Sequence, residues 1–155
     1  MVLAVFAGLP GVGKSTLARQ VGAALPAAVL GVDAVDAALR VYDVSEPRPG
    51  HAAYGVVAAL AETQLTLGLS VIIDAVNPVA ATRRMWTELA ERLDVPLRVV
   101  EVVCGDEDVL RRRRSSRGET GGGPVEYEPY LGPRIVVDTH LAVDPVLPVV
   151  EYLRK

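Results

Sequence analysis

The sequence predicts an α/β fold that is built on a parallel sheet. Short apolar runs alternate along the chain with longer amphipathic stretches, the pattern of strands joined by crossover helices. Half of the 155 residues are apolar, yet only one Trp, five Tyr and one Phe are present, and alanine and valine dominate. Such a composition suits a buried parallel sheet covered by helices that are rich in small residues. A chain of this length is expected to form one domain, residues 1–155, with a sizeable core.

Each predicted element rests on its own pattern. Apolar runs of strand length occupy residues 2–7, 27–31, 70–75, 97–103 and 134–138. Amphipathic runs of helix length occupy residues 14–25, 33–42, 51–67, 79–93, 107–117 and 146–154. Asn77-Pro78 is a typical helix start, and Pro148 falls in the first turn of the last helix, where proline is tolerated.

The turn after the first strand carries the most specific motif. Its sequence, Gly8 to Ser15, is G-L-P-G-V-G-K-S and fits G-x-x-x-x-G-K-[ST] at every fixed position. Glycines let backbone N–H groups curl around an anion, and the following helix points its positive dipole end at the same phosphates. Lys14 is expected to reach the β- and γ-phosphates, and the Ser15 hydroxyl to bind Mg²⁺. The predicted nucleotide-binding residues of this loop are Gly8, Gly11, Val12, Gly13, Lys14, Ser15 and Thr16.

Lysine usage strengthens the prediction for Lys14. The chain has fourteen arginines but only two lysines, Lys14 and Lys155. Such a bias indicates that arginine replaces lysine over most of the surface. A lysine kept inside the glycine-rich loop is therefore informative, because that position needs a compact ammonium on a thin stem.

Two further strand ends carry carboxylates. Asp74 closes an apolar strand, where it is expected to hold Mg²⁺; the alternative is that it caps the following turn. Asn77, the only asparagine, either caps the next helix or points into the cleft. Asp33 follows the second strand and is the candidate general base that takes a proton from an acceptor hydroxyl. The alternatives are a simple helix cap at Asp33, or Asp36 as the base.

An arginine-rich stretch precedes a long glycine-rich segment. Four consecutive arginines on a helix spread around its circumference, whereas Arg113 and Arg117 are four apart and share a face. This pair is expected to bind ATP and to neutralise charge during phosphoryl transfer, from a lid over about residues 111–132. The alternative is a solvated basic helix end.

Other candidates have weaker signals. Cys104 is expected to be a small buried residue, and Trp86 to pack in the core rather than stack on a base. His51 is a possible substrate contact at the start of its helix. Tyr127 and Tyr130 either pack the return of the lid or touch a nucleotide, with packing favoured.

Charge and composition exclude several function classes. A net charge of −3 does not favour a general nucleic-acid-binding surface. One cysteine allows neither an internal disulfide nor a thiolate metal cluster. The N-terminal apolar run has no basic region or cleavage site, and no apolar stretch reaches the roughly 18 residues of a membrane span. A cytoplasmic protein is expected.

Taken together, these residues resemble the small P-loop kinases of the AAA-like group, whose relatives include the zeta-toxin, chloramphenicol phosphotransferase, gluconate kinase and polynucleotide kinase families. The resemblance covers residues 2–153. It rests on Gly8–Thr16, Asp33, Gly68–Ala75, R-x-x-x-R from Arg113 to Arg117, and Y-x-P-Y…I-V-V-D-T from Tyr127 to Thr139. It implies a three-layer P-loop NTPase fold with strand order 2-3-1-4-5, ATP with Mg²⁺, and phosphate transfer to a hydroxyl acceptor.

The chain departs from this family at one position. Relatives often carry a basic residue three positions after the base-like aspartate, and here that residue is Asp36. The acceptor site thereby loses a cation, which disfavours a phosphorylated or acidic acceptor.

Three functions fit the sequence. The first is an ATP-dependent phosphotransferase acting on a small-molecule hydroxyl, such as that of a metabolite, a nucleoside-like compound or an antibiotic. The second is a polynucleotide 5′-hydroxyl kinase, which the negative net charge disfavours. The third is a non-kinase ATP-binding or ATP-hydrolysing switch protein. A guanine-reading Asn-Lys-x-Asp segment is absent from the sequence, because its one asparagine precedes a proline.

Overall fold

The computed structural model describes residues 1–44, 51–116 and 126–155. Its strands are β1 (Leu3–Ala7), β2 (Ala28–Gly31), β3 (Val71–Asp74), β4 (Leu97–Val103) and β5 (Ile135–Asp138). Its helices are α1 (Lys14–Ala24), α2 (Val32–Val41), α3 (His51–Thr66), α4 (Ala80–Leu93), α5 (Glu107–Ser115) and α6 (Val146–Arg154). The predicted elements are thus confirmed, with ends shifted by a residue or two.

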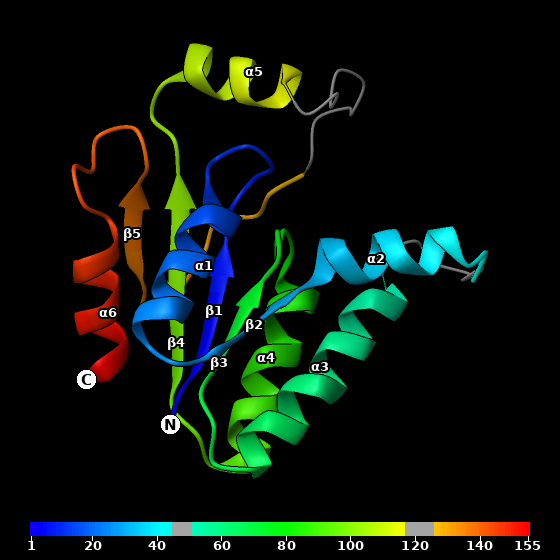
Figure 1. The fold of residues 1–155 in the computed structure, drawn as a ribbon. Helices are drawn as coiled ribbons and strands as arrows, with labels where there is room; N and C mark the ends of the chain where they lie inside the picture. The colour runs from blue at the N-terminus through cyan, green and yellow to red at the C-terminus, as the bar shows by residue number, and fades with distance from the viewer. Residues whose placement is uncertain (45–50, 117–125) are drawn as a thin grey trace.

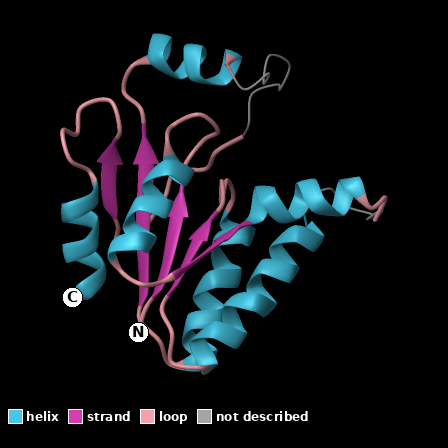
Figure 2. Ribbon diagram, viewed as in Figure 1, coloured by secondary structure: helices cyan, strands magenta, loops and turns pink. Residues whose placement is uncertain are grey.

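The five strands form one parallel sheet in the order β2-β3-β1-β4-β5 (Figure 1). All the arrows point the same way in Figure 2, and helices cover both faces. The strand order that the family resemblance implied is therefore confirmed. Parallel strands need crossover connections, and the amphipathic stretches of the sequence supply them.

The core consists of two layers, one on each face of the sheet. Leu3 and Val5 of β1 face a cluster that includes α3 and α4, whereas Ala4 and Phe6 face a cluster that includes α1 and α6. Every residue of β1 is fully buried, because this strand lies at the centre of the sheet. Burial on both faces explains why its sequence is apolar throughout rather than alternating.

The register brings three strand ends together at one edge. Phe6 of β1 lies opposite Asp74 of β3, and Gly31 of β2 lies opposite the same aspartate. The loop after β1 and the first turn of α2 therefore flank Asp74. Ligands of open α/β sheets bind at this carboxyl edge.

No helix among the described residues is long and apolar enough to cross a membrane.

Candidate functional site

The loop between β1 and α1 has a backbone that only glycines permit. Gly8, Gly11 and Gly13 have φ angles of 144°, 86° and 95°, in the region that side chains disfavour. A Cβ on Gly8 would lie 2.3 Å from the carbonyl oxygen of Val102 on β4, so the loop can pack against the sheet only without one. This arrangement confirms that the motif forms a tight loop leading into a helix.

The N-terminus of α1 is open to an anion. Gly13 is the N-cap residue, no side chain caps the helix, and its first turn holds no acidic residue. Ser15 is partly buried and Thr16 is exposed. Uncapped backbone N–H groups and the helix dipole together favour bound phosphate at this position.

Lys14 is buried, and it is paired with Asp74. Its side chain is 6% exposed and that of Asp74 is 12% exposed, with 2.7 Å between Nζ and Oδ1. Lysine is almost never buried unless it is paired. The pair fixes both predicted phosphate-site residues beside the loop.

The start of α1 and the end of β3 offer ligands that suit a magnesium ion. Mg²⁺ prefers oxygen ligands, keeps several waters, and is commonly held by one or two protein groups together with substrate phosphates. The described residues contain no group of three or more histidine, cysteine or acidic side chains that would form a complete metal cage. Ser15 and Asp74 offer one hydroxyl and one carboxylate, which is the donor set that such a shared site needs.

Asn77 plays a structural part that the sequence did not reveal. Its side chain is fully buried, donates to the carbonyls of Phe6 and Ala75, and accepts a 2.7 Å hydrogen bond from Nε1 of Trp86. Both predicted roles, helix cap and cleft residue, are therefore wrong. Asn77 has a φ of 50°, and its hydrogen bonds tie the loop after β3 to the core. Trp86 packs in the core, as predicted.

Arg83 of α4 joins two segments that are far apart in the sequence. Its guanidinium donates to the carbonyls of Asn77 and Pro78 on one side and to those of Glu128 and Pro129 on the other. The shortest of these contacts, to the Glu128 carbonyl, is 2.5 Å. The segment that returns from the predicted lid is thus held against the loop after β3.

Aromatic rings and a helix cap strengthen the contact between the returning segment and the loop after β3. The Arg83 guanidinium lies 5.1 Å from the ring centre of Tyr127 and 4.2 Å from that of Tyr130. Burial raises the pKa of Tyr127 to about 12, and burial also raises the pKa of Tyr130. The Glu128 carboxylate accepts a 2.7 Å hydrogen bond from the backbone N–H of Ala80, at the start of α4. Packing of both tyrosines is confirmed.

Two arginines of α5 contact the phosphate loop. Arg113 donates to Oγ1 of Thr139 at 3.0 Å and to the carbonyl of Val12 at 3.4 Å, and Thr139 in turn donates to the same carbonyl. Arg114, which sequence reasoning did not single out, donates to the carbonyl of Pro10 at 3.1 Å. The predicted partner Arg117 lies outside the described residues. Asp106 caps α5 at its other end, and backbone hydrogen bonds lower the pKa of its carboxyl.

A cavity of about 420 Å³ lies beside the start of α1. The residues that line it include Gly13, Thr16, Gln20, Arg113 and Thr139. The phosphate loop and Arg113 therefore face the same space.

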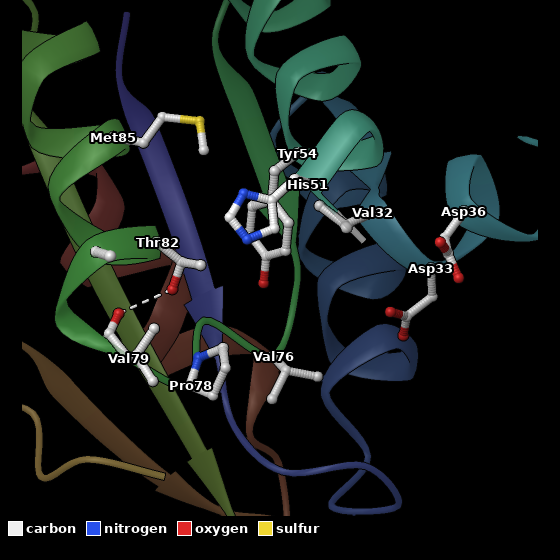
Figure 3. Close-up of a pocket in the computed structure, with 11 residues that line it drawn as sticks. Val32, Asp33, Asp36, His51, Tyr54, Val76, Pro78, Val79, Thr82 and Met85 are labelled. Atoms are coloured by element: carbon white, nitrogen blue, oxygen red, sulfur yellow. Dashed lines mark hydrogen bonds between the residues drawn. The ribbon is translucent and has the colours of Figure 1, made fainter. Parts of the chain in front are cut away.

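A second cavity of about 460 Å³ lies between α2, α3 and α4 (Figure 3). Asp33, Asp36, His51 and Tyr54 line it, together with the apolar side chains at the start of α4. Val76 belongs to its wall, and the Val76 carbonyl accepts a hydrogen bond from the N–H of Gly8. A hydrogen bond therefore connects the phosphate loop to the wall of this cavity.

Both candidate bases lie on α2. Asp33 is exposed in the first turn of α2, and its negative charge contributes to the raised pKa of Tyr54, which is mainly caused by burial. Asp36 accepts a 2.9 Å hydrogen bond from Nε of Arg40 one turn later. Cys104, expected to be buried, is only partly so and packs at the edge of the core.

The glycine loop, the open helix end and the paired lysine define a P-loop nucleotide-binding protein. The AAA domain family model matches residues 3–129, and the chain belongs to that family. No match to the chain is found among curated proteins.

Solved structures share the fold. A candidate kinase from Chloroflexus aurantiacus J-10-fl has 23% identity and a TM-score of 0.79, over 99% of this chain and 93% of that one. The Mycobacterium tuberculosis APS kinase CysC, in complex with AMPPNP and APS, has 21% identity and a TM-score of 0.73, over 99% and 98%. A gluconokinase from Sinorhizobium meliloti 1021 has 20% identity and a TM-score of 0.63, over 98% and 89%. The chain therefore has the fold of P-loop kinases.

Proposed function

We propose that this protein is an ATP-dependent kinase that transfers the γ-phosphate of ATP to a hydroxyl group of a small molecule. One observation carries the proposal: the phosphate loop lines one cavity at Gly13 and is hydrogen-bonded at Gly8 to the wall of another. A kinase needs two such spaces, one for the nucleotide and one for the acceptor, with the transferred phosphate between them.

The residues divide between these tasks. Backbone groups of the phosphate loop and the Lys14 ammonium would hold the phosphates, and Arg113, which lines the same cavity as Gly13, would contact the nucleotide. Ser15 and Asp74 would hold Mg²⁺. When bound, the ion would neutralise phosphate charge.

Asp33 is proposed as the general base. It would accept the proton of the acceptor hydroxyl while that oxygen bonds to the γ-phosphorus and the bond from phosphorus to the ADP oxygen breaks. The products are ADP and a phosphate monoester. The position of Asp33 on the second cavity supports this role, and Asp36 is the competing carboxylate.

Purified protein with ATP, Mg²⁺ and a pool of small alcohols tests the proposal. A product heavier than its alcohol by one PO₃H unit is expected in the mass spectrum. Lys14→Ala should abolish its formation, whereas Lys155→Ala removes the only other lysine and should leave it intact. ATP hydrolysis with no phosphorylated product would favour a switch protein, and transfer confined to oligonucleotide ends would favour a polynucleotide kinase.

A further inference from the structure

Thr139 lies where the end of β5 meets the phosphate loop. Its backbone N–H donates to the Val103 carbonyl at 3.0 Å, which fixes the residue to the end of β4. In Figure 1, α5 crosses above this carboxyl edge of the sheet, over the loop that joins β1 to α1. The side chain of Thr139 is therefore placed between α5 and the phosphate loop, and it contacts both.

The hydrogen bonds of the Thr139 hydroxyl have a defined direction. A hydroxyl has one proton, and the Val12 carbonyl accepts it, since the Val103 carbonyl is farther away at 3.4 Å. A guanidinium can only donate, so the hydroxyl oxygen accepts the 3.0 Å hydrogen bond from Nη1 of Arg113. The result is a relay that runs from Arg113 through the hydroxyl to a carbonyl of the phosphate loop.

This relay fixes the peptide that joins Val12 to Gly13. Its carbonyl accepts from Thr139 and, at 3.4 Å, directly from Arg113. A trans peptide is planar, and the described residues contain no cis peptide bond, so the N–H of Gly13 points to the opposite side. Backbone N–H groups of such a loop are the donors that hold phosphates. By orienting the carbonyl, the hydroxyl therefore also orients a donor for phosphate.

Gly13 is packed against the same threonine. A Cβ on Gly13 would lie 3.3 Å from both Cγ2 and Oγ1 of Thr139. With a φ of 95°, Gly13 is the N-cap residue of α1, and a glycine has more backbone conformations available than any other residue. Contact with a fixed neighbouring side chain restricts this freedom before a ligand arrives, which lowers the entropic cost of binding.

The loop is held in a similar way two residues earlier. Nε of Arg114 donates to the Pro10 carbonyl at 3.1 Å, and a Cβ on Gly11 would lie 3.0 Å from Cγ of the same arginine. Helix α5 thus contacts the loop at two carbonyls. Thr139 takes part only in the second of these contacts, where it adds a donor from β5.

We infer that Thr139 is a positioning residue for phosphate binding. Its hydroxyl holds the Val12–Gly13 peptide with the N–H turned towards the phosphates, and it fixes the Arg113 guanidinium beside the loop. The inference rests on the proposed function, of which it needs only the nucleotide-binding step. Thr139 also lines the cavity beside α1, so the competing role is direct contact with the base or the ribose.

Substitutions at Thr139 separate its hydroxyl from its shape. Thr139→Val keeps the branched shape and removes the hydroxyl, Thr139→Ala removes the hydroxyl without adding a methyl group, and Thr139→Ser keeps the hydroxyl. Calorimetry measures the affinity for ADP with Mg²⁺, and displacement of a fluorescent ADP analogue measures the affinity for pyrophosphate, which has phosphates only. The valine and alanine variants should bind both ligands about tenfold more weakly, and the serine variant should stay within about threefold of the unmodified protein.

Thr63→Val is the matched control. Thr63 is exposed on α3, and its hydroxyl donates to the Ala59 carbonyl of its own helix at 3.0 Å. The same chemical change at this position should leave both affinities unchanged. Urea unfolding verifies that each variant is folded, and the alanine variant carries the test should the valine variant fold poorly.

Three results would overturn the inference: unchanged affinities in the valine and alanine variants, equal losses in the serine and valine variants, or a loss for ADP with none for pyrophosphate. The last result would assign the hydroxyl to the base or the ribose. The expected pattern in a protein that phosphorylates no alcohol would support the inference and count against the kinase proposal alone. Failure of the unmodified protein to bind ADP would overturn both.

Discussion

Lys14 and Asp74 form an ion pair at the centre of the carboxyl edge of the sheet, with 2.7 Å between Nζ and Oδ1. The aspartate is thus the counter-ion of the lysine. A β- or γ-phosphate that binds the loop would take over this role. The Asp74 carboxylate, which we propose as a Mg²⁺ ligand together with Ser15, would then be released from the lysine.

The interaction between Lys14 and Asp74 should be measurable as a coupling free energy when no nucleotide is added. Asp74→Asn leaves a buried ammonium without its partner and should lower the free energy of unfolding by about 1–3 kcal/mol. Lys14→Met in the same chain should recover part of this loss, because no buried charge then remains. Urea unfolding of the two single variants and the double variant measures the coupling. Strictly additive effects would contradict it. Glu62→Gln breaks the exposed pair with Arg92 and serves as the control, with an expected change below about 1 kcal/mol.

Asp33 and Asp36 can be distinguished by amide substitution. Asp33→Asn should reduce kcat by about 10²- to 10⁴-fold and leave binding of an ATP analogue largely intact, because a general base acts only in the chemical step. Asp36→Asn should have a smaller effect, because the proposed base Asp33 is still present in that variant. Steady-state kinetics with an identified acceptor measures kcat, and calorimetry measures the affinity for the ATP analogue. A larger loss for Asp36→Asn would exchange the two roles.

Arg113 should contribute to catalysis or nucleotide binding, whereas Arg112 should not. Arg113→Ala removes the guanidinium that lies beside Thr139 and the phosphate loop, and kcat/KM for ATP should fall by about tenfold or more. Arg112 is exposed, and within the described part of the chain its side chain donates to the carbonyl of Asp108 in its own helix, so Arg112→Ala is the matched control. Equal effects of the two changes on kcat/KM would indicate a general contribution of positive charge instead.

Arg83 should matter for stability more than any other described arginine on α4. Arg83→Ala leaves four backbone carbonyls without this donor and should lower the free energy of unfolding by about 2 kcal/mol or more. Arg84→Ala removes an exposed arginine from the adjacent position and should change it by less than about 0.5 kcal/mol. Denaturant unfolding compares the two, and similar small losses would show that the carbonyls find water equally well.

Stability at high pH should depend on Tyr127. Burial raises its pKa to about 12 in the folded protein, above the ordinary value of 10.0. The unfolded chain therefore loses this proton first as pH rises, and the folded state should lose stability between about pH 10 and 12. Tyr127→Phe should make this decline shallower in urea unfolding at a series of pH values. Tyr42→Phe, at a side chain that is 80% exposed, should not.

Much of this molecule could be predicted from sequence because its signals are local. A strand buried on both faces has a continuous apolar run, and a phosphate loop needs glycines and one lysine at fixed spacing. Arg83 gives no such signal, because its partners are backbone carbonyls of segments that only the fold brings together. The predicted roles of Asn77 were wrong for a related reason. Its position before Pro78 suggested a cap, whereas its partners include Phe6 and Trp86, which are distant in the sequence.

The arginine segment was predicted in part. Helical spacing singled out Arg113, which lies beside the phosphate loop, but it could not show that Arg114 also reaches the loop, at the carbonyl of Pro10. That contact depends on where α5 lies over the sheet. Proximity of this kind is set by tertiary packing rather than by a pattern within the helix.

The lysine distribution determines how this protein can be attached to a surface. Lys14 is only 5% exposed, so amine-reactive reagents should couple at the N-terminal amino group and at Lys155. Both chain ends lie away from the carboxyl edge of the sheet (Figure 1). Coupling through amines should therefore orient the molecules on the surface. The phosphate loop would face the solution and be accessible to ligands in a flow-based binding assay.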